Sequence, residues 1–79
     1  MEKIKTLDGH TLTIYVFNTF CGAAHVFVDD YREDRNVQCT RSNDELAVLR
    51  SEAKHANLKD ILFSFGWTIK DMFGNTIRF

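Results

Sequence analysis

The chain has 79 residues, of which 44% are hydrophobic and 27% charged, and its formal net charge is −1. This composition is typical of one folded domain and excludes an intrinsically disordered chain. The complete absence of proline excludes a proline-rich linker or ligand segment. The balanced charge argues against nucleic-acid binding through phosphates, which normally requires a basic surplus.

Two β-strands joined by a tight turn are predicted at the start of the chain. The first begins at Ile4, and Asp8-Gly9 is the turn signal. A three-residue loop with Gly9 in the left-handed region pairs Ile4 with Leu12 and places both on the same face as Ile14. A two-residue loop would place Ile4 on the opposite face, so the longer loop is preferred.

Strict alternation of side chains predicts two further strands, over residues 10–18 and 23–29. In both segments one face is aliphatic. The opposite face carries the aromatic residues Tyr15, Phe17, His25 and Phe27. Val37 and Cys39 share one face of a fourth short strand. Four successive strands with short connections predict an antiparallel meander.

A charged turn separates the third predicted strand from the fourth. Its carboxylates are Asp29, Asp30, Glu33 and Asp34. The turn lacks the spacing and the central glycine of a calcium loop, and basic residues interrupt it. We therefore expect a solvated turn, which can act as a polar rim that steers a basic partner.

A broken helical segment follows the strands. Ser42 and Glu45 have the spacing of a capping box, which predicts a helix start. The apolar stripes of residues 46–53 and 58–65 are rotated by more than about 120° relative to each other, so one straight helix cannot bury both. We expect a break near Asn57, whose side chain can cap the second helix.

The second helical stripe has a competing interpretation, because residues 61–69 also alternate as a strand would. Gly66 favours the helix, since glycine commonly follows the last helical residue. We expect Phe63, Phe65 and Trp67 to contribute to the core under the helices.

The end of the chain is predicted to be extended from Trp67 onward. Gly74-Asn75 suits a tight turn, which predicts a C-terminal β-hairpin with Met72 opposite Ile77. The expected fold is therefore a single small α+β domain over residues 1–79. It consists of an antiparallel four-stranded meander sheet packed by a broken helical segment, with a C-terminal β-hairpin.

The side chains that could carry chemistry do not form a known motif. Four residues could bind zinc, but their spacing matches no zinc module: Cys21, His25, Cys39 and His55. No asparagine or aspartate can be assigned to orient a Cys–His pair, and the glycines are too isolated for a phosphate loop. Two cysteines without an export signal predict reduced thiols in a cytoplasmic protein. We expect no enzyme activity, no cofactor and no metal.

The aromatic strand face is the feature that points to a function. Exposed aromatic residues on a small domain are typical of a protein interface. The expected partner-binding residues are Tyr15, Phe17, His25 and Phe27, with Asp29, Asp30, Glu33 and Asp34 as the rim. Two alternatives remain open: the C-terminal hairpin covers this face as a second core, or a second copy of the chain covers it in a homodimer.

The expected function is that of a non-enzymatic protein-binding module that acts by occluding a partner, without contact to a membrane. By size, such a chain is similar to phage and mobile-element accessory proteins, including anti-CRISPR inhibitors of host defence. The alternative is a small nucleic-acid-binding regulator that uses Lys3, Lys5, Arg41 and Arg50.

Overall fold

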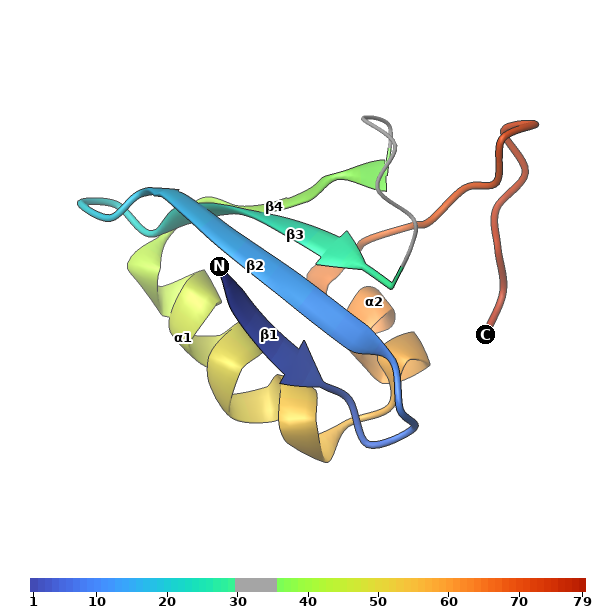
Figure 1. Ribbon diagram of the computed structural model, residues 1–79, viewed down its shortest axis with the longest axis horizontal. Helices are drawn as coiled ribbons and strands as arrows, with labels where there is room; N and C mark the ends of the chain where they lie inside the picture. The colour runs from blue at the N-terminus through green and yellow to red at the C-terminus, as the bar shows by residue number, and fades with distance from the viewer. Residues whose placement is uncertain (30–35) are drawn as a thin grey trace.

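A computed structural model describes residues 1–29 and 36–79, and its centre is a four-stranded antiparallel sheet (Figure 1). The strands are β1 (Glu2–Lys5), β2 (Thr11–Asn18), β3 (Ala23–Val28) and β4 (Gln38–Thr40). Each strand pairs with the next one along the chain, in the order β1-β2-β3-β4. The predicted α+β class and antiparallel meander are therefore confirmed.

The β1–β2 turn has the predicted register. Ile4 pairs with Leu12, and Gly9 has a φ of 88°, in the left-handed region that favours glycine. The Thr6 N–H donates a hydrogen bond of 2.7 Å to the His10 carbonyl. This arrangement places the aliphatic side chains of β1 and β2 on the same face of the sheet.

The helical segment is broken, as the two apolar stripes predict. It comprises α1 (Asn43–Glu52), the 3₁₀ turn η2 (Ala53–His55) and α2 (Leu58–Phe65). The Ser42 hydroxyl accepts a hydrogen bond from the Glu45 N–H and so caps α1. Gly66 ends α2 with a φ of 69°. The helical interpretation of residues 58–65 is therefore confirmed over the strand.

The predicted cap of α2 is wrong, because the Asn57 side chain makes no capping hydrogen bond. Asp8, in the β1–β2 turn, takes this role, and its Oδ1 accepts from the Leu58 N–H at 3.1 Å. The Leu7 N–H donates to the Ala56 carbonyl beside it. The β1–β2 turn thus docks onto the break between the helices.

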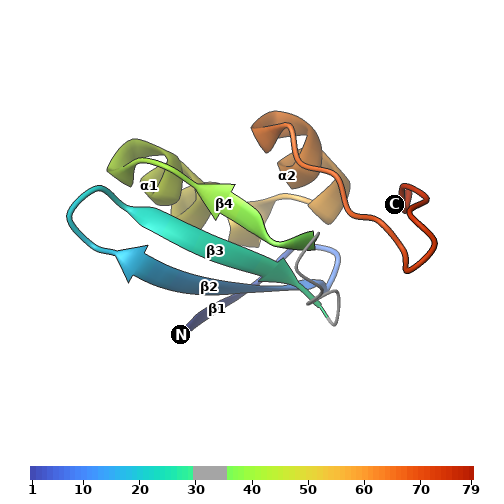
Figure 2. The same cartoon turned by 90° about the horizontal axis from the view of Figure 1, so that it is seen from above.

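Both helices lie on one face of the sheet (Figure 2). The buried hydrophobic residues between the layers are all aliphatic: Leu12, Ile14, Ala24, Val26, Val28, Leu46, Leu49, Ala53, Leu58, Ile61, Leu62 and Ile69. The expectation that Phe63 contributes to this core is wrong, since 90% of its surface is exposed. Phe65 and Trp67 are half-buried at the core's edge, where their rings stack 4.7 Å apart.

The predicted C-terminal hairpin is not confirmed as a pair of strands. Residues 67–79 carry a single isolated bridge between Lys70 and Thr76, so the predicted pairing of Met72 with Ile77 is wrong. The cause is Asp71, whose Oδ1 accepts hydrogen bonds from the backbone N–H groups of Phe73 and Asn75. These bonds close a longer turn than the expected two-residue loop.

Side chains next to β4 hold this C-terminal segment in place. The buried Asn36 donates to the Lys70 carbonyl and accepts from the Lys70 N–H, and Gln38 donates to the Thr68 carbonyl. The segment then runs beyond α2 (Figures 1 and 2). The helices of residues 1–29 and 36–79 are all too short or too polar to cross a membrane.

Candidate functional site

The sheet face opposite the helices carries the aromatic residues that the sequence predicts for partner binding. Tyr15 lies directly across from His25 in the β2–β3 pairing, and Phe27 lies across from Thr13. We call Tyr15, Phe17, His25 and Phe27 the sheet patch. The helices of the described chain pack against the other face (Figure 2), so they leave this patch uncovered.

The aromatic rings of the sheet patch contact one another. The ring centroids of Phe17 and His25 are 4.6 Å apart, and those of His25 and Phe27 are 6.5 Å apart in an edge-on arrangement. Tyr15 is 51% exposed and Phe17 53% exposed, while His25 and Phe27 are half-buried. The rings of Phe17, His25 and Phe27 therefore adjoin one another, and Tyr15 lies across from His25 on the neighbouring strand.

The C-terminal segment does not fold back over the sheet patch. Its backbone is held beside β4 by Asn36 and Gln38, and from there it runs beyond α2 (Figures 1 and 2). The alternative in which a C-terminal hairpin buries these aromatics as a second core does not hold for Tyr15 and Phe17, since both remain half-exposed.

Two lysines of β1 flank the sheet patch on the same face. Lys3 pairs with Thr13, which in turn pairs with Phe27, and Lys5 pairs with Thr11. Both lysines are exposed, and neither forms an ion pair with a residue of the described ranges. The sequence names both lysines for the nucleic-acid-binding alternative but not for the aromatic face. The predicted β1–β2 register already places them there, because it pairs Ile4 with Leu12 and so Lys3 with Thr13 and Lys5 with Thr11.

The acidic residues that were expected to form a rim divide into two groups. Asp29 does not face outward as a free carboxylate. Its Oδ2 lies 2.6 Å from Nδ1 of His10, and its Oδ1 accepts from the Thr11 N–H at 2.8 Å. Asp29 thus closes the end of the β2–β3 pair. Asp30, Glu33 and Asp34 lie outside the described residues.

The four side chains considered as zinc ligands do not come together. Cys39 is opposite His25 on the sheet, Cys21 lies in the β2–β3 turn, and His55 is on η2 at the helical side. Within residues 1–29 and 36–79, no group of three histidine, cysteine or carboxylate side chains is arranged to hold a metal ion.

Comparison of the chain with family models, with curated proteins and with solved structures finds no match.

Proposed function

We propose that this chain is a non-enzymatic protein-binding module that acts by covering a surface of its partner with the sheet patch. The observation that carries the proposal is the half-exposure of Tyr15 and Phe17 on a sheet face that the helices leave open. Tyrosine and phenylalanine are enriched in protein interfaces, where they bury a large area. A partner that covers both rings would remove this exposed apolar surface from water.

The backbone beneath the sheet patch favours binding. β2 is paired on both of its sides, with β1 and with β3, so the aromatic side chains project from a rigid surface. The contact of Phe17 with His25 further restricts the two rings. Because these side chains are already ordered, binding costs less conformational entropy than it would for a flexible loop.

We extend the proposal, by analogy of size alone, to an accessory inhibitor of host defence of the anti-CRISPR type. Such an inhibitor needs only to occlude a surface. The face carries cationic Lys3 and Lys5 beside its aromatic residues, so the fitting partner surface is apolar with acidic groups at its edge.

The test uses two variants of the tagged chain. Each is captured by its tag from a lysate of the cells that express the chain, and mass spectrometry identifies the proteins bound to it. The variant Tyr15→Ala/Phe17→Ala should lose the captured protein and keep a native circular dichroism spectrum. Phe73→Ala is the matched control, because it removes an exposed aromatic residue of the C-terminal segment, outside the sheet patch. It should capture the partner as the natural chain does.

Two results would contradict the proposal. Unfolding of the Tyr15→Ala/Phe17→Ala variant would show that these residues stabilise the monomer instead of an interface. Equal capture by that variant and by Phe73→Ala would place the contact elsewhere. If the natural chain self-associates in light scattering and the Tyr15→Ala/Phe17→Ala variant does not, the partner is a second copy of the chain.

A nucleic-acid-binding regulator is the second candidate, and the position of Lys3 and Lys5 favours it. The open sheet face carries aromatic rings next to lysines. Single-stranded nucleic acid binds to such surfaces, because its bases stack on the rings and its phosphates pair with the cations. The same capture experiment distinguishes the two candidates. Treatment with nuclease leaves a protein complex intact and removes one that depends on nucleic acid.

A further inference from the structure

A second surface feature lies on the helical side, between α2 and the C-terminal segment. It is a cavity of about 320 Å³, at the lower end of the range for small-molecule sites. The buried side chains of Leu62 and Ile69 contribute to its wall, and Ile77 adds a half-buried one. The hydrogen bond from the Ile77 N–H to the Ile69 carbonyl joins two of these wall residues.

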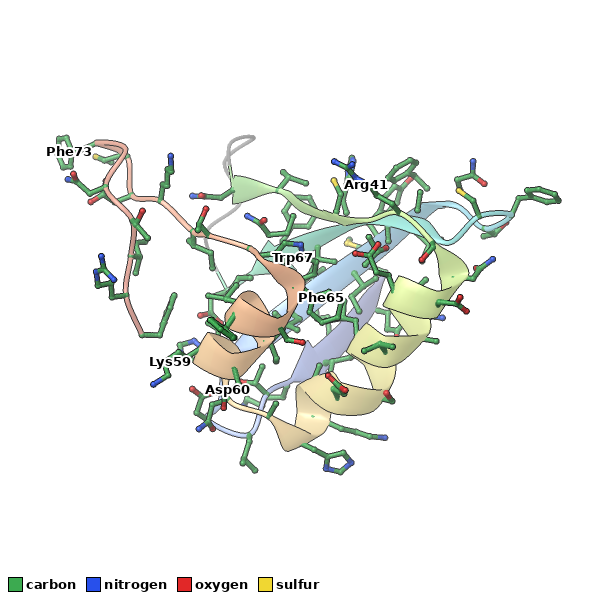
Figure 3. The ribbon with its side chains drawn as sticks, turned by 180° about the vertical axis from the view of Figure 1, so that it is seen from behind. Arg41, Lys59, Asp60, Phe65, Trp67 and Phe73 are labelled. Atoms are coloured by element: carbon green, nitrogen blue, oxygen red, sulfur yellow. The ribbon has the colours of Figure 1, made fainter. Side chains whose placement is uncertain are left out.

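The charged side chains that line this cavity are all cationic. Of the described residues that line it, the charged ones are Lys59, on α2, and Arg78, in the C-terminal segment. Both are exposed, and neither has an ion-pair partner among residues 1–29 and 36–79. Figure 3 shows Lys59 projecting from α2 toward the side on which the C-terminal segment lies. Among the described residues that line the cavity, an anion would therefore meet two cationic side chains from different elements and no carboxylate side chain.

Aromatic rings supply the apolar part of the site. Phe63, Trp67 and Phe79 all line the cavity. Phe63 is 90% exposed, so the folded chain provides no cover for it. An aromatic ring in the cavity packs against these rings in an offset or edge-on arrangement, which adds to the gain from the buried apolar area.

We propose that this cavity binds a small carboxylate with an aromatic body. The carboxylate pairs with the Lys59 ammonium and the Arg78 guanidinium, and the aromatic body packs among Phe63, Trp67 and Phe79. The site is separate from the sheet patch, because its lining residues belong to α2 and the C-terminal segment, and α2 lies on the opposite face of the sheet (Figure 2). Loss of one function therefore leaves the other testable.

The probe is 2-naphthoate, titrated into the full ¹⁵N-labelled chain. Trp67 is the one tryptophan in the sequence, so its indole N–H gives a single, assigned signal beside the cavity. We expect that signal to shift with 2-naphthoate. The neutral analogue 2-naphthamide should bind about three- to tenfold more weakly, because it lacks the charge that both cations attract.

Variants of the two cations test the geometry. Lys59→Gln and Arg78→Gln should each weaken 2-naphthoate binding about three- to tenfold and leave 2-naphthamide binding unchanged. Lys54→Gln is the matched control, because Lys54 is an exposed lysine on η2 that does not line the cavity. Equal affinity of the acid and the amide would overturn the proposal. Binding that shifts signals of the sheet patch instead of Trp67 would overturn it too.

Discussion

At the scale of single residues, Asp8 connects three parts of the fold through one carboxylate. Its Oδ1 accepts from the Thr6 hydroxyl at 2.7 Å and from the Leu58 N–H at 3.1 Å, and its Oδ2 lies 3.8 Å from Nε2 of His10. The Thr6 hydrogen bond is the main cause that lowers the pKa of Asp8 below its ordinary value. The Leu58 bond and the charge of His10 add to it, against the opposing effect of desolvation.

The lowered pKa of Asp8 predicts a loss of stability in acid. A carboxyl group with a lower pKa in the folded state stabilises the fold fully above its unfolded pKa. This contribution disappears as the pH falls through the folded pKa. The variant Asp8→Asn should therefore have a lower Tm near neutral pH and a shallower decrease of Tm below about pH 4. Thermal unfolding followed by circular dichroism from about pH 2 to about pH 7 measures both effects.

Asp44→Asn is the control for this experiment, since the Asp44 carboxylate makes no hydrogen bond with residues of the described part. It should keep the acid profile of the natural chain. If Asp8→Asn kept the full acid decrease as well, another group would be responsible. The sequence identified Asp8 as a turn residue but not as a helix cap, because Leu58 approaches it only after the tertiary fold has formed.

At the scale of elements, the sequence predicts correctly those strands, turns and helix breaks that depend only on residues of the same segment. Alternation predicts β2 and β3, the turn at Gly9 predicts the β1–β2 register, and the two misaligned stripes predict the break between the helices. The C-terminal segment is different. Its position depends on Asn36, which lies 34 residues away from Lys70 in the sequence. No local periodicity carries that information, so the sequence alone predicts an ordinary hairpin.

The Asn36 contact predicts how the C-terminal segment is held. Asn36→Ala removes both hydrogen bonds to Lys70 at a site that is only 1% exposed. We expect a loss of about 1–3 kcal/mol in the free energy of unfolding, because the Lys70 backbone groups lose their buried partner. Urea denaturation measures this loss, and hydrogen exchange should show faster exchange of the Lys70 amide.

The matched control for the Asn36 contact is Asn57→Ala. The Asn57 side chain makes no capping hydrogen bond, so this variant should change stability by less than about 0.5 kcal/mol. If Asn57→Ala instead lowered the free energy of unfolding by about 1 kcal/mol, Asn57 would cap α2 after all, as the sequence predicts. An unchanged Lys70 amide in Asn36→Ala would show that the segment is held by its apolar contacts alone.

At the scale of the whole molecule, apolar residues divide by type between interior and surface. The core is aliphatic, while Phe17, Phe20, Phe63 and Phe73 each expose half or more of their surface. Alternation predicted the two faces of the sheet correctly, and it placed Tyr15 and Phe17 away from the aliphatic side. The expectation of Phe63 in the core rests on its residue type alone. Helical periodicity gives the right side, because the stripe of Leu58, Ile61 and Leu62 faces inward and leaves Phe63 outside it.

This division predicts that aliphatic and aromatic residues contribute unequally to stability. Leu49 is fully buried, so Leu49→Ala should cost about 2–5 kcal/mol, a large part of the roughly 5–15 kcal/mol that holds a domain folded. Phe63→Ala removes more atoms but should cost less than about 0.5 kcal/mol, because Phe63 is already in water in the folded state. Urea denaturation at two protein concentrations measures both costs. A cost for Phe63→Ala that approaches that of Leu49→Ala, and that grows with concentration, would show that Phe63 is buried between two copies of the chain.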